Sequence, residues 1–253
     1  MKLKDKVTVI TGAATGLGFE TAKLFFHEGA SVVGTFHNQY DEKKIKDAFG
    51  DSERMLYIQT DITRVNDVKR FANEIGKKFE RVDVLVNNAA VDTSGNVEDT
   101  PEDEFKRIMD VNVYGMFLVT KYIIPLMKKG KKGGSIINVA SSIGLMGMAN
   151  RLAYTTSKGA VVNFTRSMAM DYVDYNIRVN AIAPGGIYTE MVDEFFKRHA
   201  SEEFKQEIFR MHVINRLADP AEISKPILFL ASDDSTYANG AIFSVDGGYT
   251  CGK

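Results

Sequence analysis

Near the start of the chain, a short apolar run passes directly into a glycine-rich turn and then into an amphipathic helix, an order that few folds accommodate. Residues 7–10 are continuously apolar, which is typical of a strand buried on both faces of a parallel sheet. Thr11 and Gly12 follow the run, and the helical pattern continues through Phe26 until Gly29. We therefore expect the first strand, turn and helix of an α/β sheet.

Strands and helices continue to alternate along the chain, without a repeat, a linker or a change in composition. The expected strands cover residues 7–10, 31–36, 55–60, 82–86, 135–139, 177–182 and 241–245. Helices are expected at residues 41–49, 66–79, 102–109, 111–129 and 150–174. The pattern predicts the α/β class, with a single doubly wound Rossmann-type domain over residues 1–253 and a parallel seven-stranded sheet flanked by helices.

Three glycines in the first turn have the spacing Gly-x-x-x-Gly-x-Gly. Gly12 would allow a tight exit from the strand, Gly16 a close approach of the backbone to a pyrophosphate, and Gly18 the packing of helix on strand. Amides at the start of the helix would face the anion. The turn predicts a nucleotide site, and the alternative is a glycine-rich turn without a ligand.

Polar or turn-forming residues stand where several predicted strands end. They are Gly12, Phe36, Asp61, Asn87, Ser141 and Pro184. Ligands of open α/β sheets bind outside the carboxyl ends of the strands, so we expect these residues to share one rim.

Tyr154 and Lys158 lie four residues apart in the predicted helix 150–174 and should therefore share a face. An ammonium group beside a phenol stabilises the phenolate, so we expect Lys158 to lower the pKa of Tyr154. With Ser141 upstream, the pair is a candidate general acid and base. Taken alone, such a pair is also common on a helix surface.

With these residues, the chain resembles the short-chain dehydrogenase/reductase family essentially from end to end. The matching motifs are Thr11-Gly12-x-x-x-Gly16-x-Gly18, Asp61, Asn87-Asn88-Ala89, Asn112, Ser141, Tyr154-x-x-x-Lys158, Pro184-Gly185 and Asp246-Gly247-Gly248. Ala90 departs from the glycine usual in the family, a mild change. The resemblance implies an NAD(P)-dependent oxidoreductase acting on CH–OH donors, which interconverts a secondary alcohol and a ketone.

The resemblance implies a catalytic tetrad of Asn112, Ser141, Tyr154 and Lys158. Tyr154 would protonate the forming alkoxide while Ser141 donates a hydrogen bond to the same oxygen. Lys158 would also hold the nicotinamide ribose, and the Asn112 carbonyl would hold a water that links Lys158 to solvent. The alternative for Asn112 is a helix cap or kink. Ser142 is the competing hydroxyl, and spacing favours Ser141.

The resemblance also implies the residues that hold the cofactor. They are Gly12, Thr15, Gly16, Leu17, Gly18, Phe36, His37, Asp61, Ile62, Asn88, Ala89, Tyr154, Lys158, Pro184, Gly185, Ile187 and Thr189. Asp61 would accept a hydrogen bond from the adenine amino group, although it is also a good helix-entry residue. Thr189 would reach the nicotinamide carboxamide, whereas Asn87 would tie strands together. No metal site is predicted.

The end of the second strand bears on the choice between NAD and NADP. A carboxylate there would bind the ribose 2′-hydroxyl and repel a 2′-phosphate, but the chain has Phe36, His37 and Asn38. Thr15 supplies no positive charge in the glycine turn. The cofactor is therefore expected to be NAD(P)(H), with NADP favoured over NAD.

A segment at about residues 188–216 matches the substrate lid of the family. Its apolar residues suggest an enclosure for substrate, although such residues are more often core; they are Met191, Phe195, Phe196, Phe209, Met211 and Ile214. His199 and His212 also lie here, and we expect surface or packing roles for both.

The motif set is similar to that of 3-oxoacyl-acyl-carrier-protein reductases and of glucose, polyol and cyclic-alcohol dehydrogenases. The reductases bind an acidic carrier through basic residues at two positions, which here are Lys132 and Tyr175, the latter after Asp171 and Asp174. Carboxylates there would repel such a carrier, so a free polyol, sugar or cyclic alcohol is predicted. A non-catalytic nucleotide-binding regulator would be expected to lack a tetrad member, and an epimerase or dehydratase would be expected to be longer.

Charge and cysteine content limit the remaining partners. A net charge of -1 gives no attraction to nucleic acid or to an anionic membrane, so neither partner is expected. Cys251 is the one cysteine, and no apolar stretch suits a signal peptide or membrane span, so a cytoplasmic protein is the default expectation. The helix from Val111 is apolar on more than one face, which together with the resemblance predicts a homotetramer.

Overall fold

The computed structural model describes residues 1–37, 42–130, 133–199 and 201–252, and these contain the predicted seven-stranded parallel sheet. The strands pair in the order β3-β2-β1-β4-β5-β6-β7. They are β1 (Val7–Ile10), β2 (Ser31–Phe36), β3 (Met55–Gln59), β4 (Val84–Asn87), β5 (Gly134–Val139), β6 (Ile177–Pro184) and β7 (Ile242–Val245). The order reverses between β1 and β4, which confirms a doubly wound Rossmann-type domain and places its ligand crevice at their carboxyl ends.

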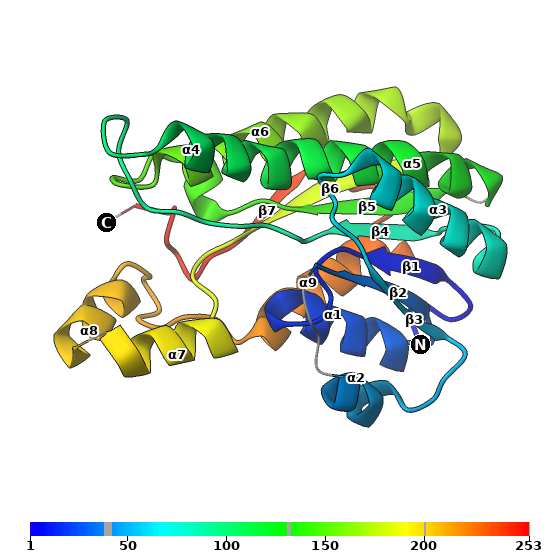
Figure 1. The fold of residues 1–253 in the computed structure, drawn as a ribbon, viewed down its shortest axis with the longest axis horizontal. Helices are drawn as coiled ribbons and strands as arrows, with labels where there is room; N and C mark the ends of the chain where they lie inside the picture. The colour runs from blue at the N-terminus through cyan, green and yellow to red at the C-terminus, as the bar shows by residue number, and fades with distance from the viewer. Residues whose placement is uncertain (38–41, 131–132, 200, 253) are drawn as a thin grey trace.

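Helices cover both faces of this sheet (Figure 1). They are α1 (Gly16–His27), α2 (Glu42–Phe49), α3 (Val65–Phe79), α4 (Glu102–Met109), α5 (Met116–Lys129), α6 (Leu152–Asp171), α7 (Glu190–His199), α8 (Glu202–Arg210) and α9 (Pro220–Ala231). Helices α3 to α6 lie on one side, and α1, α2 and α9 lie on the other. The pair α7 and α8 stands apart from both layers.

Several predicted helix boundaries differ from the structure: the predicted helix 150–174 ends at Asp171, before a 3₁₀ turn at Val173–Tyr175, and two other differences have identifiable reasons. The predicted helix 111–129 begins as a π-helical segment, Asp110–Gly115, before α5. The predicted helix 150–174 starts two residues late because Asn150 has φ of 57°, which an α-helix does not accommodate. Apolar periodicity does not register either of these backbone changes.

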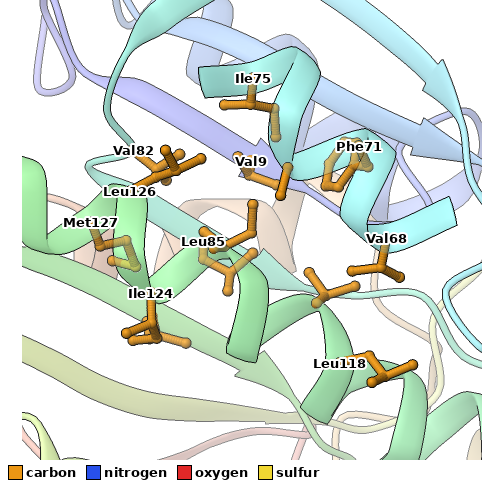
Figure 2. Packing of buried hydrophobic residues seen from close by; sticks show 14 of the residues in the cluster. Val9, Val68, Phe71, Ile75, Val82, Leu85, Leu118, Ile124, Leu126 and Met127 are labelled. Carbon is orange, nitrogen blue, oxygen red and sulfur yellow. The ribbon is translucent and has the colours of Figure 1, made fainter. Parts of the chain in front are cut away.

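The larger hydrophobic cluster fills the space between the sheet and helices α3 and α5 (Figure 2). Phe71 and Ile75 of α3 are fully buried with Val9 of β1 and Leu85 of β4. Burial of side chains of this size stabilises a fold by about 1.5–3 kcal/mol each relative to exposure. The central strands that end at the predicted site are therefore firmly held.

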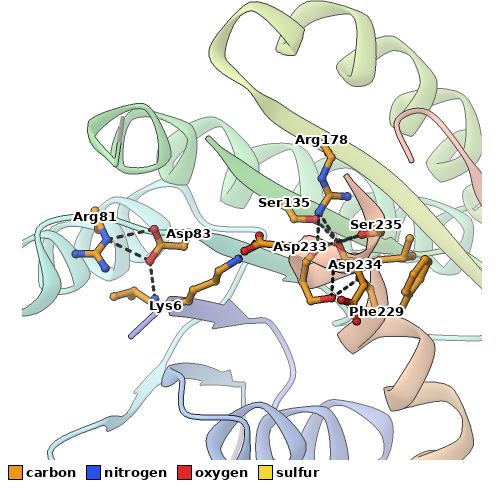
Figure 3. A network of polar contacts seen from close by, with 12 residues as sticks. Lys6, Arg81, Asp83, Ser135, Arg178, Phe229, Asp233, Asp234 and Ser235 are labelled. Atoms are coloured by element: carbon orange, nitrogen blue, oxygen red, sulfur yellow. Dashed lines mark hydrogen bonds and ion pairs between the residues drawn. The ribbon is translucent and has the colours of Figure 1, made fainter. Parts of the chain in front are cut away.

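A polar network ties the amino ends of the strands together, at the rim opposite the predicted site (Figure 3). The Asp83 carboxylate accepts a hydrogen bond from the Val7 amide at 2.7 Å and pairs with Arg81 at 3.2 Å. Lys6 pairs with Asp233 at 2.7 Å. In the part of the chain that the structure describes, no helix combines the length and apolarity needed to cross a membrane.

Candidate active site

A cleft of about 1180 Å³ lies along the glycine turn and the ends of β2, β3 and β4. It is lined by most of the residues predicted to hold a cofactor: Gly12, Thr15, Gly16, Leu17, Gly18, Phe36, His37, Asp61, Ile62, Asn88, Ala89 and Thr189. The remaining predicted residues do not line it; they are Tyr154, Lys158, Pro184, Gly185 and Ile187. The structure therefore brings most of the predicted cofactor residues to one cleft, and their binding of a cofactor stays a prediction.

The glycine turn is shaped to receive a dinucleotide. Gly12 and Gly16 have φ of 65° and 53°. The side-chain amide of Asn88 donates hydrogen bonds to the Thr11 and Gly12 carbonyls at 2.9 and 3.1 Å. A Cβ on Gly18 would lie 2.1 Å from the Gly12 oxygen. These contacts hold the turn at the start of α1, where helix amides and the large cleft together fit a phosphate-bearing cofactor.

Gly18→Ala is expected to destabilise the fold by about 1–3 kcal/mol and to weaken cofactor binding, because its methyl group would overlap the Gly12 carbonyl. Glycine to alanine inside a helix ordinarily stabilises by roughly 1 kcal/mol, so the sign of the change is diagnostic. Gly147→Ala is the matched control, since a Cβ there meets no atom within 4 Å. Thermal unfolding and cofactor titration measure both effects; equal stability of the two variants would contradict the packing role.

At the end of β3, Asp61 lies between a helix-entry turn and the cleft. Its carboxylate accepts hydrogen bonds from the Thr63 amide at 2.9 Å and hydroxyl at 2.7 Å, and His37 Nε2 lies 3.7 Å away. Burial acts to raise the pKa of Asp61, but the bonds from Thr63 and the nearby positive charges hold it below its ordinary value. Asp61 is thus an ionised hydrogen-bond acceptor that lines the cleft beside Ile62. Asn38, which follows His37 in the sequence, lies outside the described residues.

Residues of α4 line the same cleft, and the sequence analysis missed them. Lys106 and Arg107 face it together with Asp110, with which Lys106 forms an ion pair. The sequence predicts only a helix at 102–109, because the residues of a helix do not indicate what its exposed face borders.

Ser141, Tyr154 and Lys158 come together at the carboxyl end of β5. Ser141 lies close enough to Tyr154 to act on the pKa of its hydroxyl, and Lys158 Nζ lies 5.5 Å from the Tyr154 ring centroid. Lys158 is buried and donates a hydrogen bond to the Val139 carbonyl at 2.8 Å. Ser142, the competing hydroxyl, is buried in the following 3₁₀ turn.

The acid–base properties differ from the expectation that Lys158 lowers the pKa of Tyr154. Burial is the largest influence on both groups: it raises the pKa of Tyr154 and lowers the pKa of Lys158 to about 8. Desolvation penalises phenolate and ammonium alike. In this structure, the desolvation cost dominates and the pKa of Tyr154 is raised. The prediction that Lys158 lowers the pKa of Tyr154 is therefore wrong for the protein without cofactor.

Asn112 lies in the π-helical segment and connects the two sides of the site. Its side chain exchanges hydrogen bonds with the Val91 backbone at 2.8 and 2.9 Å and donates to Ser157 Oγ at 3.0 Å. Ser157 in turn donates to the Tyr154 carbonyl at 2.7 Å. Ser157 was missed, because a serine inside a helix carries no sequence signal for such a bond. π-Helical turns occur often at functional sites.

The other singled-out residues have structural contacts. Asn87 donates to Asn138 on β5 at 2.8 Å, which confirms that it ties strands together. Ala90 is exposed at the cleft, so the extra methyl group fits without strain. His212 Nε2 accepts a hydrogen bond from the Gly186 amide at 2.9 Å, and its ring lies 5.1 Å from that of Tyr249, so it has the expected packing role.

The segment predicted as a lid forms α7 and α8 beside the cleft. Thr189 precedes α7 and would contact a Cβ on Gly16 at 3.4 Å, so the lid begins against the glycine turn. Phe196 is buried among aromatic rings of both helices, while Phe195 and Met211 are partly exposed. The side chains of Met191 and His199, and residue 200, lie outside the described residues.

Several known proteins are similar to this chain over nearly its whole length. Residues 12–250 match the family model described as enoyl-(acyl carrier protein) reductase. The chain is 34% identical over 249 residues to the 3-oxoacyl-[acyl-carrier-protein] reductase FabG of Thermotoga maritima, covering 98% of this chain and 99% of that protein. It is 36% identical over 250 residues to meso-2,3-butanediol dehydrogenase of Serratia marcescens, covering 99% and 96%.

A solved structure described as ElxO with NADP bound has the same fold, with a TM-score of 0.92 and 32% identity over 98% of this chain and 100% of that one. The fold, the candidate site and the similar proteins all indicate the same family. The chain belongs to the short-chain dehydrogenase/reductase family and is an NAD(P)-dependent oxidoreductase that acts on CH–OH donors.

Proposed function

We propose that the protein interconverts a secondary alcohol and a ketone on a free, uncharged small molecule such as a polyol, sugar or cyclic alcohol. The observation that carries this proposal is the grouping of Ser141 and Tyr154 with a buried Lys158, whose Nζ lies 5.5 Å from the Tyr154 ring centroid. A hydroxyl pair of this kind can bind one oxygen atom of an alcohol or ketone and exchange its proton. When bound, the nicotinamide cofactor supplies or accepts the hydride.

In reduction, Ser141 donates a hydrogen bond to the carbonyl oxygen, and the Tyr154 hydroxyl gives its proton to the same oxygen as negative charge develops. Oxidation reverses the transfer, so Tyr154 must then lose its proton before it can accept one. Lys158 supports that step by placing an ammonium group beneath the phenol ring. Asn112 and Ser157 position the turn of α6 that carries Tyr154.

The cofactor would be held by residues of the cleft and its continuation. Gly12, Gly16 and the first amides of α1 would bind the pyrophosphate, and Asp61 with Ile62 would bind the adenine. Asn88 and Ala89 would pass beneath the cofactor, and Thr189 would bind the carboxamide. Lys158 and Tyr154 would contact the ribose next to the reacting carbon, and the loop of Pro184, Gly185 and Ile187 would border the nicotinamide.

NADP is the favoured cofactor in this proposal. Phe36 and His37 end β2 without a carboxylate, and the His37 side chain is 65% exposed beside the cleft. Of the described residues at the end of β2, neither Phe36 nor His37 carries a charge that repels a 2′-phosphate, and protonated His37 would attract it. Thr15 adds no charge, so the preference over NAD is expected to be modest.

Reduction of a carrier-bound 3-oxoacyl group is the second candidate function, and one contact favours it. Lys128 Nζ lies 3.5 Å from the ring centroid of Tyr175, so α5 supplies a cation at the position where the sequence offered none. The neighbouring Asp171 and Asp174 oppose an acidic carrier, and Lys132 lies outside the described residues. The balance still supports a free substrate.

The proposal also includes the assembly of four subunits and the closure of the predicted lid over the substrate. Tyr114 of the π-helical segment and Phe117 of α5 are 43% and 41% exposed, with ring centroids 6.2 Å apart, and an apolar exposed face of this kind supports burial in a homotetramer. Light scattering that gave a monomer at micromolar concentration would contradict it. Residues at about 188–216 would close over the substrate in a cytoplasmic enzyme.

One kinetic experiment tests the function. Catalytic efficiency is measured for polyols, sugars and cyclic alcohols with NAD and with NADP, and for a 3-oxoacyl group carried by acyl-carrier protein or by a short thiol. We expect turnover of free alcohols and a modest NADP preference. A carrier preference of about a hundredfold, equivalent to ~2.7 kcal/mol of recognition, would instead establish the second candidate.

A further inference from the structure

An ion pair borders the catalytic tyrosine and has no part in the mechanism above. Arg151 immediately precedes α6, and its guanidinium forms an ion pair with the Asp92 carboxylate. Tyr154 lies three residues after Arg151, in the first turn of α6. Asp92 follows Val91, which lines the cofactor cleft. The pair therefore joins the segment that borders the cleft to the start of the helix that carries Tyr154.

Backbone contacts already join the two segments that carry this pair. The Gly95 amide donates to the Asn150 carbonyl at 2.9 Å, and the Leu152 amide donates to the Gly95 carbonyl at 3.2 Å. The Arg151 and Asp92 side chains are 33% and 47% exposed, and exposed ion pairs contribute about 0–1 kcal/mol to stability. Stability alone does not account for two charged groups beside the catalytic hydroxyl.

Both charges act on the catalytic groups. After burial, Asp92 is the next largest influence on the pKa of Tyr154 and raises it, whereas Arg151 lowers it. Arg151 also acts on Tyr249, whose hydroxyl lies 3.5 Å from Met148 Sδ. The pair thus stands within electrostatic reach of the reacting oxygen, next to an aromatic and thioether surface suited to a carbon skeleton.

We propose that Asp92 and Arg151 form a specificity site for a second hydroxyl group on the substrate, one or two carbon atoms from the carbinol that Tyr154 binds. The guanidinium donates an N–H to the oxygen of this hydroxyl, and the carboxylate accepts its hydrogen. The inference rests on the proposed function and narrows its substrate class to 1,2- or 1,3-diols, including polyols and sugars.

The charge balance explains this choice of class. Because the pair is neutral overall, it offers an anionic substrate an attraction to Arg151 together with a repulsion from Asp92. A monoalcohol would displace water from both charged groups without replacing the hydrogen bonds. Sites built around a substrate hydroxyl discriminate against analogues that lack it, because polar groups that lose water when substrate binds are then left without a replacement hydrogen bond.

Two matched substrate pairs test the inference: butane-2,3-diol against butan-2-ol, and cyclohexane-1,2-diol against cyclohexanol. We expect the wild type to prefer each diol by about tenfold or more in kcat/KM, equivalent to ~1.4 kcal/mol. Arg151→Gln, Asp92→Asn and the double variant should bring the ratio within about threefold of unity. The diols should lose more kcat/KM than the monoalcohols in every variant, because a change in the charge around Tyr154 affects both substrates alike and cancels from the ratio.

Arg70→Gln on α3 is the control, since it alters an exposed arginine away from the site. It should leave the diol preference intact. Thermal unfolding and cofactor titration verify that the variants are folded. Equal losses for diols and monoalcohols would mean that the pair only positions α6, and an absent wild-type preference would equally overturn the inference. Lack of turnover with every alcohol would instead overturn the proposed function, and the inference with it.

Discussion

Tyr154→Phe is expected to lower kcat by about 10²–10⁴-fold while cofactor affinity stays within about threefold. The substitution removes the hydroxyl that lies near Ser141 and leaves the ring in place above Lys158. Proton transfer is then lost, but packing is retained. Steady-state kinetics on an alcohol substrate and fluorescence titration with the reduced cofactor measure the two quantities.

Tyr172→Phe is the matched control, because it makes the same change beyond the carboxyl end of the same helix. Its kcat should equal that of the wild type within about twofold. Residual activity of Tyr154→Phe within tenfold of the wild type would exclude Tyr154 as the proton donor and would leave Ser141 as the remaining candidate.

The fold was predictable because its pattern is local and repeated. Strand β2 begins and ends at its predicted residues, since a glycine precedes it and polar residues follow it. Parallel pairing then places the carboxyl ends of all strands on one rim, so Gly12, Asp61 and Ser141 converge without further information. The same logic brought Tyr154 and Lys158 together, four residues apart on one helix.

Features that depend on contacts between distant segments were not predictable. Ser157 links Asn112 to the Tyr154 backbone, yet its sequence position suggests only a polar helical residue. Lys128 reaches Tyr175 from a different helix and offsets only part of the negative charge inferred from Asp171 and Asp174. Periodicity reports which face of a helix is buried, but not which partner that face meets.

The sign of the Tyr154 pKa change illustrates the same limit. Spacing on a helix established that Lys158 would be near, and Coulomb attraction was expected to dominate. Burial was the missing quantity, because desolvation depends on every segment packed around the pair. Its consequence for Lys158 can be measured as a pH-dependent free energy of unfolding.

Lys158→Met is expected to remove the pH dependence of stability that this buried amine creates. In the folded protein, burial lowers the pKa of Lys158 from 10.5 to about 8. Below pH 8, both folded and unfolded states carry the proton, and the folded state bears the full cost of burying it. As pH rises from about 8 to 10.5, the folded state loses its proton first, so the wild type becomes more stable relative to the variant by about 3 kcal/mol.

Urea unfolding at fixed protein concentration, repeated between pH 7 and 10.5, measures this difference. The Val139 carbonyl loses its donor in Lys158→Met, but that cost is the same at every pH and cancels from the trend. Lys69→Met removes an exposed ammonium on α3 and should run parallel to the wild type. A wild-type stability that rises no faster than that of Lys158→Met would mean that the amine stays charged when buried. Lys158 would then favour the Tyr154 phenolate throughout this pH range, as the sequence alone suggested.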